Sequence, residues 1–306
     1  MMARLLFMPS APEPSSRAFP DNGTLMNCPR PILTTCRARD LPVLEITARK
    51  LPEMVPCRQL YVIAPDSDCR QIQRRLGPEV CVIAENDFIP GMTLGKLRNL
   101  KAPGFPKMAG WYFQQFLKLQ FAFVETGEDF YLIWDADTIP LRPMRFFDSA
   151  GRMLLTKAIE YHVPYFETYR RLFGTEPHRE FSFIAQHMLV QKSVAREMLA
   201  AIERQIQGTD GWAWKIMSAL PADQGMQTFS EYETYGHYIK NHHPDRVRWI
   251  DRQWLREPAF HSGRPVPSAE ELKALAEKYE YAAFERAYKG WRRLAMLFIN
   301  KLRQGR

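Results

Sequence analysis

The stretch "FYLIWDADTIPLRP", residues 130–143, joins a wholly apolar run to two carboxylates, Asp135 and Asp137, that are separated by one alanine. A short apolar run bounded by turn residues is typical of a strand buried on both faces of a parallel sheet. Pro140 and Pro143 follow closely, so no regular helix begins there that needs the two acids as caps. The sequence therefore predicts two acids at the carboxyl end of a buried strand, where open α/β sheets bind ligands.

The chain before this stretch alternates apolar runs with segments of helical spacing. The apolar runs are "PILTT" (31–35), "QLYVIA" (59–64) and "VCVIA" (80–84), and "DLPVLEITARKL" and "SDCRQIQRRL" lie between them. An alternation of strand and helix is typical of a parallel sheet. We therefore predict an α/β fold with a mostly parallel sheet flanked by helices.

A glycine- and proline-containing segment, residues 86–110, interrupts this alternation and is expected to be a loop. The segment that follows, 110–125, has apolar residues at helical spacing and carries Lys118 on its polar face. The sequence thus predicts an amphipathic helix leading into the strand that ends at Asp135.

The second half of the chain has a less regular pattern. We expect a strand or two strands joined by a kink at 181–191, a helix at 193–206 capped by Ser193, a helix from 229, a strand at 246–250, and mostly helix at 268–303. The expected organisation is a loose leader (1–29), one main domain (30–265) with two halves (30–143 and 144–265), and a helical carboxyl-terminal extension (266–306).

The net charge of +8 is concentrated at one end of the chain. Residues 286–306 hold seven Lys and Arg residues and no acid, so the rest of the chain carries only +1. A nearly neutral body disfavours nucleic acid as a partner, because nucleic-acid binding needs a basic stripe along a folded face. The terminal cations alternate with apolar residues, which predicts either peripheral membrane contact through a basic amphipathic helix or an ordinary packing helix.

Targeting and redox features favour a cytoplasmic protein. No apolar run is long enough to span a membrane, and the apolar part of the first residues is too short for a signal peptide. The five cysteines include no C-x-x-C pair, so reduced thiols are expected. We therefore expect a cytoplasmic location, at the inner face of the membrane if the terminal segment binds lipid.

The chain contains two D-x-D motifs. Asp66 and Asp68 stand where a helix is expected to begin, so capping of its first turn accounts for them. Asp135 and Asp137 have no helix to cap, and their mutual repulsion favours a bound cation. Mg²⁺ or Mn²⁺, which prefer oxygen ligands, suit this pair, while two solvated turn aspartates remain the alternative.

A strand that ends in D-x-D, about one hundred residues after the first strand, resembles the metal site of nucleotide-sugar glycosyltransferases of the GT-A fold. More narrowly, "GWYFQQFLKLQFA", "FYLIWDADTIPLRP" and "FSEYETYG" resemble a bacterial glycosyltransferase-like family of unknown function, over about residues 30–262. The resemblance implies a UDP- or GDP-sugar donor and a glycan or lipid-linked acceptor in surface polysaccharide synthesis. It also implies that residues 30–265 form a catalytic domain with a nucleotide-sugar half (30–143) and an acceptor half (144–265).

The resemblance also implies roles for particular residues. Asp135 and Asp137 would hold Mn²⁺ or Mg²⁺ against the donor diphosphate, with Asp137 acting in catalysis, and His261 would complete the metal shell, although His242 and His243 compete with it. Thr35 falls where such enzymes hold the nucleoside, and Lys118 would reach the donor phosphates or sugar. A metal stabilises a departing diphosphate without a proton, which fits this chemistry.

An inverting transfer needs a base for the acceptor hydroxyl. Ser230 and Glu233 have the spacing of a capping box, so Glu233 is expected to have a structural role. Glu231 is then the candidate base, or else a first-turn glutamate favoured by the helix dipole. Inverting and retaining transfer both remain open.

Two other functions are compatible with the motifs. In a phosphatase of the haloacid-dehalogenase type, "WDADT" would supply Asp135 as nucleophile and Asp137 as acid/base. Such an enzyme usually starts near this motif, whereas three expected strands precede it here. The other alternative is a non-catalytic binding module with a GT-A-like fold.

Overall fold

The computed structural model describes residues 30–100, 105–208, 210–221, 227–256 and 266–285. A five-stranded sheet in the order β3-β2-β1-β4-β7 forms its centre. The strands are β1 Arg30–Thr35, β2 Cys57–Ala64, β3 Val80–Ala84, β4 Phe130–Trp134 and β7 His187–Gln191. The first four are parallel, and β7 runs antiparallel to β4 at one edge. The predicted α/β class with a mostly parallel sheet is confirmed.

The D-x-D strand lies inside this sheet. Ile32 and Leu33 of β1 pair with Leu132 and Ile133 of β4, and all four side chains are almost fully buried. Burial on both faces explains why the run before Asp135 is apolar throughout rather than alternating.

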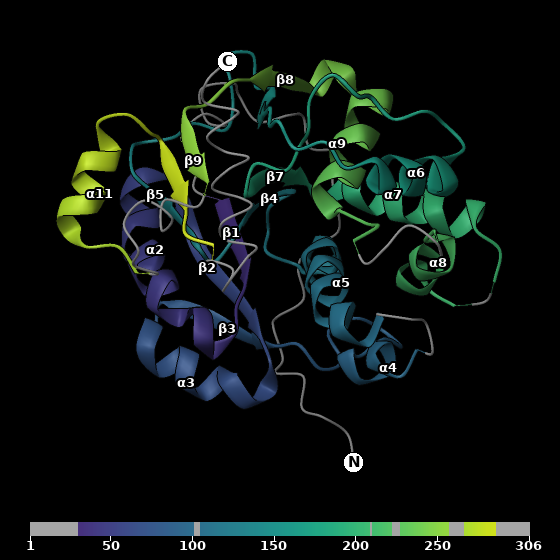
Figure 1. Cartoon of the computed structure of the whole chain (residues 1–306), viewed down its shortest axis with the longest axis horizontal. Coiled ribbons are helices and arrows are strands. Elements are labelled where there is room, and N and C mark those ends of the chain that lie inside the picture. Colours follow the sequence, from purple (N-terminus) through teal and green to yellow (C-terminus); the bar gives the residue numbers. More distant parts are fainter. Residues whose placement is uncertain (1–29, 101–104, 209, 222–226, 257–265, 286–306) are drawn as a thin grey trace, which may run out of the picture.

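Helices cover both faces of the sheet. Figure 1 shows α2 (Leu41–Met54) and α3 (Asp66–Leu76) on one side, and α5 (Phe105–Gln120) on the other. The expectation that residues 86–110 form a loop is wrong in part, because α4 (Leu94–Arg98) lies within them and α5 begins before residue 110. The hydroxyl of Thr93 accepts the Lys96 amide at the start of α4, and Leu94 and Leu97 are buried, which stabilises so short a helix.

The acids of the first D-x-D motif do not cap α3. The residue before the helix is Pro65, and Asp66 and Asp68 lie in its first turn. Each accepts an amide from another segment: Asp68 from Ala38, and Asp66 from Asn86. These acids therefore connect α3 to the segments around Ala38 and Asn86, a role that depends on contacts between distant parts of the chain.

The second half of the chain is mainly helical. It contains α6 Val163–Phe173, α7 Lys192–Gln205, α8 Trp212–Ala219 and α9 Glu231–His242, which Figure 1 shows gathered beside β7. The prediction that Ser193 caps α7 is wrong. The helix begins at Lys192, so Ser193 already lies in its first turn. Both the amide and the hydroxyl of Ser193 donate to Asp129, which precedes β4.

Two small sheets complete the described residues. One has the order β5-β10-β9 and the other pairs β6 with β8. Their strands are β5 Thr138–Pro140, β6 Met153–Thr156, β8 Val247–Ile250, β9 Trp254–Arg256 and β10 Tyr281–Ala283, and α11 Ala269–Ala276 lies before β10. The helical prediction for residues 281–283 is wrong, because these residues form β10. This strand pairs antiparallel with β5, which directly follows the D-x-D turn.

The described residues contain no helix that is long and apolar enough to cross a membrane. The predicted leader and the basic terminal segment, 286–306, lie outside the described residues.

Candidate functional site

The turn at Asp135, Ala136 and Asp137 is fixed by backbone hydrogen bonds on both sides. The Asp135 amide donates to the carbonyl of Gln186 over 3.0 Å, and the amide of Phe284, just after β10, donates to the Asp137 carbonyl over 2.6 Å. Gln186 has a positive φ of 62°, which is rare for a residue with a side chain and aims its carbonyl at the turn. The turn is thus held between β7 and β10, two segments far away in the sequence.

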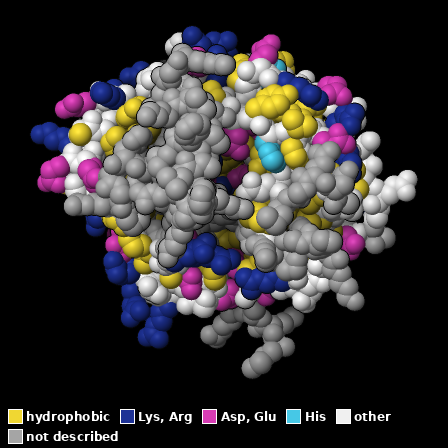
Figure 2. Space-filling view, viewed as in Figure 1, with side chains coloured by type: hydrophobic (Ala, Val, Ile, Leu, Met, Phe, Trp, Pro, Cys, Tyr) yellow, Lys and Arg dark blue, Asp and Glu magenta, His cyan; other side chains and the backbone are white. Residues whose placement is uncertain are grey.

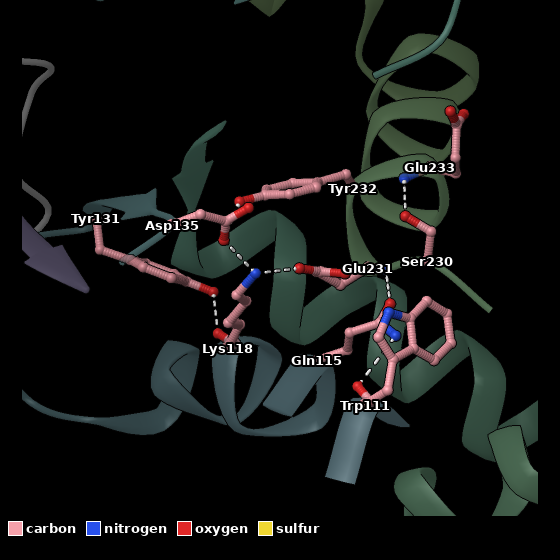
Figure 3. A network of polar contacts seen from close by, with 9 residues as sticks. All are labelled: Trp111, Gln115, Lys118, Tyr131, Asp135, Ser230, Glu231, Tyr232 and Glu233. Carbon is pink, nitrogen blue, oxygen red and sulfur yellow. Dashed lines mark hydrogen bonds and ion pairs between the residues drawn. The ribbon is translucent and has the colours of Figure 1, made fainter. Parts of the chain in front are cut away.

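A buried lysine joins two acids of the site. Lys118 Nζ lies 2.6 Å from Asp135 Oδ1 and 2.7 Å from Glu231 Oε1, as Figure 3 shows. Lys118 and Glu231 are only 5% and 4% exposed. Burial alone would lower the pKa of Lys118, but the two carboxylates outweigh it and the pKa is raised. The lysine is therefore a permanent cation between two anions.

Tyr232 is a second partner of Asp135. Its hydroxyl donates to the same oxygen, Oδ1, over 2.9 Å, and its ring lies 4.7 Å from Lys118 Nζ. Asp135 therefore has one oxygen engaged by two donors, while the described residues offer no hydrogen bond to Oδ2. This arrangement fixes the plane of the carboxylate and leaves one oxygen for a ligand.

Helices α5 and α9 are tied together beneath this network. Gln115 of α5 accepts the backbone amide of Glu231, and the hydroxyl of Tyr131 donates to the Lys118 carbonyl over 2.9 Å. The amide of Glu231 lies in the first turn of α9, and an amide in a first turn has no hydrogen-bond partner within its own helix. Gln115 thus acts across the helix pair as a cap, and it sets the position of Glu231 relative to Lys118 (Figure 3).

Asp137 has a different environment. Burial raises its pKa to about 7, and the charges of Asp135 and Glu285 act in the same direction. No ion pair to Asp137 occurs among the residues that the structure describes. The charge of Lys118 opposes this rise but does not cancel it, so a further positive charge would favour the ionised carboxylate.

Glu233 has a structural role, but not as one half of a capping box. The Ser230 hydroxyl accepts the Glu233 amide as predicted. The Glu233 carboxylate turns away from Ser230 and accepts the Ser182 hydroxyl and the Phe183 amide, and it lies 3.1 Å from His237. Ser182, Glu233 and His237 are all at most 2% exposed, so they stabilise the core and leave Glu231 as the acid that faces Lys118.

A pocket of about 350 Å³ lies next to the D-x-D turn. It is formed at the carboxyl ends of β1, β2 and β3 and by the side of α5, and its lining includes Thr35, Cys36, Arg37, Arg39, Asp40, Ile63, Pro65, Glu85, Arg98, Gly110, Trp111, Phe113, Gln114 and Leu117. Thr35 ends β1, and the parallel pairing of Leu33 with Ile133 sets the end of β1 beside the end of β4, where the D-x-D turn begins. Figure 2 shows a hollow in the middle of the molecule with acidic and basic side chains inside it.

The structure brings together most of the residues that the sequence analysis selected. Asp135, Lys118 and Glu231 form one network, Asp137 lies two residues from Asp135, and Thr35 lines the adjacent pocket. His261 lies outside the described residues. Of its competitors, His243 pairs with Glu197, and His242 packs on Tyr238.

Sequence reasoning missed the charged residues of the pocket and the contact of Tyr232 with Asp135. Glu85 and Arg37 each come within two residues of the end of a predicted strand, as Asp135 does. The rule that ligands bind at the carboxyl ends of parallel strands applies to them equally and could have found them.

Asp135 and Asp137 fit a divalent cation as two oxygen ligands. The described residues contain no group of three or more His, Cys, Asp or Glu side chains that could share a metal. The raised pKa of Asp137 and the engagement of only one Asp135 oxygen are the observations that favour a cation here. Mg²⁺ is commonly held by one or two carboxylates together with phosphates and waters, so two protein ligands suffice.

The chain belongs to the family of unknown function DUF6492, whose model matches residues 41–288. No curated protein matches the sequence.

Several solved structures resemble this one at low identity. A complex of the galactosyltransferase LgtC with donor and acceptor sugar analogues is 11% identical, with a TM-score of 0.45 over 88% of this chain and 94% of that one. Apo mouse xyloside xylosyltransferase 1 is 9% identical, with a TM-score of 0.43 over 83% of this chain and 97% of that one. The apo bifunctional glycosyltransferase WbbM is 10% identical, with a TM-score of 0.42 over 86% of this chain and 46% of that one.

Proposed function

We propose that this protein is a metal-assisted glycosyltransferase that moves a sugar from a UDP- or GDP-sugar to a glycan or lipid-linked acceptor. One observation carries the proposal: Lys118 joins Asp135 to Glu231 beside a second acid, Asp137, which forms no ion pair among the described residues. The group lies at the carboxyl end of a parallel strand, next to a pocket that is large enough for part of a nucleotide.

Donor binding is assigned to the pocket and the D-x-D turn. Thr35 and the neighbouring wall would hold the nucleoside, and Asp135 and Asp137 would hold Mn²⁺ or Mg²⁺. When bound, the cation would supply positive charge to the diphosphate that leaves the sugar. Arg37 and Arg98 form no ion pair among the described residues, so further positive charge is available to the phosphates.

Glu231 is proposed as the base for the acceptor hydroxyl in an inverting transfer. Burial raises the pKa of its carboxyl, and the attraction of Lys118 offsets part of this rise. A carboxylate with a raised pKa is a better proton acceptor near neutral pH than one in water. Lys118 would hold Glu231 in place through Oε1 and could contact the donor from the same position.

Aromatic side chains beside Glu231 support a sugar acceptor. Trp111, which lines the pocket, stacks on Tyr165 at 6.4 Å, and His162 packs against Tyr165 at 4.4 Å. Tyr165 is near enough to Glu231 for that charge to affect its pKa, although burial is the main cause of its rise. Figure 2 shows hydrophobic and histidine side chains next to the hollow. Tyr165 is buried in this aromatic rim, so the partly exposed rings of Trp111 and His162 are the ones that can pack against the apolar face of an acceptor glycan.

We further propose that the reaction belongs to bacterial surface polysaccharide synthesis on the cytoplasmic side of the membrane. The exposed apolar side chains Ile159, Tyr161 and Val163 near the aromatic rim support a lipid-linked acceptor. Membrane contact through residues 286–306 is proposed from sequence alone. Deletion of residues 291–306 should reduce binding to anionic liposomes, and unchanged binding would contradict that contact.

A thermal-shift screen of UDP- and GDP-sugars with and without Mn²⁺ tests the proposed function. We expect metal-dependent stabilisation by at least one nucleotide sugar, which Asp135→Asn and Asp137→Asn should abolish. Asp251→Asn, which removes an exposed acid outside the site, is the matched control. Glu231→Gln should keep donor binding and abolish sugar transfer. Absence of any metal-dependent shift would contradict the proposal, and hydrolysis of simple phosphate esters would favour the phosphatase alternative.

A further inference from the structure

The loop between β6 and α6 carries an exposed apolar surface. Ile159 is 85% exposed, Tyr161 59% and Val163 52%, and they are three of the five large apolar side chains that are exposed in the described part of the chain. The two residues between them are partly buried. Because an extended segment directs alternate side chains to opposite sides, these three share one side of the loop. We call them the 159–163 surface.

The backbone of this loop is held at both ends. The amide of Ala158 donates to the Ser182 carbonyl over 2.8 Å, and the Ser182 amide donates to the Ala158 carbonyl over 2.9 Å. Near the other end, Nε2 of His162 lies 2.6 Å from the carbonyl oxygen of Gln227. The apolar side chains are thus held outward by a fixed backbone, so a partner does not have to order the loop when it binds.

The loop presents no unpaired acid beside its apolar side chains. Glu160 is the only acidic residue within 157–163. Its carboxylate forms an ion pair with Arg256, and its side chain is 30% exposed. An apolar partner can therefore cover the 159–163 surface without removing water from an uncompensated negative charge.

Cations border this surface. Lys157 begins the loop, and the guanidinium of Arg179 lies 5.4 Å from the ring of Phe166, which packs against Tyr161 at 5.0 Å. Lys157 and Arg179 each pair with an exposed acid at 3.3 Å. Because exposed ion pairs contribute little, both cations can exchange these partners for the phosphates of lipid headgroups.

The size and chemistry of the surface favour a lipid bilayer over another protein. A stable protein interface buries about 800 Å² on each partner, which is more than three side chains of one loop supply. A tyrosine between aliphatic side chains suits the boundary between acyl chains and headgroups, because its ring is apolar and its hydroxyl is polar.

We propose that the 159–163 surface docks on a lipid bilayer, with Ile159 and Val163 among the acyl chains and Tyr161 at the level of the headgroups. This contact is separate from the one proposed for residues 286–306, and it does not depend on sugar transfer. Since His162 lies in the same loop, the aromatic rim proposed for the acceptor would face the membrane.

Co-sedimentation of the full-length protein with vesicles of phosphatidylcholine and phosphatidylglycerol tests this inference. In 1 M salt the screening length falls to about 3 Å, so the binding that remains reports apolar insertion rather than the basic terminal segment. We expect the double variant Ile159→Ser, Val163→Ser to lower the partition coefficient at least about fivefold. Phe123→Ser is the matched control: Phe123 is 44% exposed but lies outside this loop, so a change within about twofold is expected.

Hydrogen exchange of the wild-type protein, measured with and without the same vesicles, locates the contact. We expect the vesicles to slow exchange of the amides of residues 159–163 and to leave those of residues 121–123 unchanged. Absence of vesicle binding in 1 M salt, equal binding by the double variant and the wild type, or unchanged exchange in the loop would overturn the inference. Dimerisation without lipid that the double variant abolishes would assign the surface to a second copy of the chain and would also overturn it.

Discussion

Lys118 and Glu231 are 113 residues apart in the chain, yet Nζ of one lies 2.7 Å from Oε1 of the other. The contact connects α5, which leads into the D-x-D strand, with the first turn of α9 in the other half of the chain. Because the lysine also binds Asp135, the acid proposed as base and an acid proposed as metal ligand share one cation. Their relative positions therefore depend on a single side chain.

Removal of this cation should destabilise the protein. Lys118→Met leaves Glu231 buried without its counter-ion, and breaking a buried pair in this way costs about 3–5 kcal/mol of unfolding free energy. Urea unfolding measures the loss. Lys157→Met is the matched control, because Lys157 pairs with Asp251, whose side chain is 78% exposed, and a change within about 0.5 kcal/mol is expected.

The same pair can be tested for coupling. Glu231→Gln removes the other charge, so the double variant Lys118→Met, Glu231→Gln should lose less stability than the sum of the two single variants. A strictly additive double variant would show that Lys118 and Glu231 do not interact in solution as they do in the structure.

Gly236 of α9 should tolerate no side chain. A Cβ at this position would lie 2.2 Å from Cγ of Phe183, whose ring is fully buried. We expect Gly236→Ala to lower the unfolding free energy by about 1–3 kcal/mol through overpacking. Gly95→Ala in α4 is the control, since the new Cβ would meet only the Thr93 hydroxyl at 3.8 Å. Equal stabilities of the two variants would refute the close packing of Phe183 on α9.

His187 should make stability depend on pH. Burial lowers the pKa of its imidazole well below the usual 6.5, and the charge of Arg252 adds to this effect. Below pH 6.5 the unfolded chain binds a proton that the folded chain does not, so the unfolding free energy should fall by up to about 1.4 kcal/mol per pH unit as pH decreases. His178 also has a lowered pKa, so the quantity to compare is the difference between wild type and His187→Gln between pH 5 and 7.5. A difference that does not change with pH would contradict the burial of a neutral imidazole.

The central sheet was predictable because it follows local patterns. Apolar runs and their spacing predicted β1, β2, β3 and β4, and they placed the candidate acids Asp135 and Asp137 at the end of β4. The errors concern features that arise from distant contacts. Residues 281–283 form a strand only because they pair with β5, and Ser193 is engaged by Asp129 rather than by its own helix.

The sequence likewise did not predict which charged side chains of the candidate site form ion pairs. Lys118 was predicted to reach the donor phosphates or sugar and Glu231 to act as the base, but neither pattern indicated that each side chain is almost fully buried against the other. Helical spacing identifies the polar face of α5, but it cannot show that α9 covers this face. The role of Lys118 in donor binding stays a prediction.

Mn²⁺ binding measured by electron paramagnetic resonance tests the central claim most directly. Titration of the protein with Mn²⁺ in the presence of UDP or GDP should show one bound ion, which is lost in the double variant Asp135→Asn, Asp137→Asn and retained in Asp251→Asn. The measurement needs neither an acceptor nor turnover. Equal binding of Mn²⁺ by the double variant and the wild-type protein would contradict the assignment of Asp135 and Asp137 as the metal-binding pair.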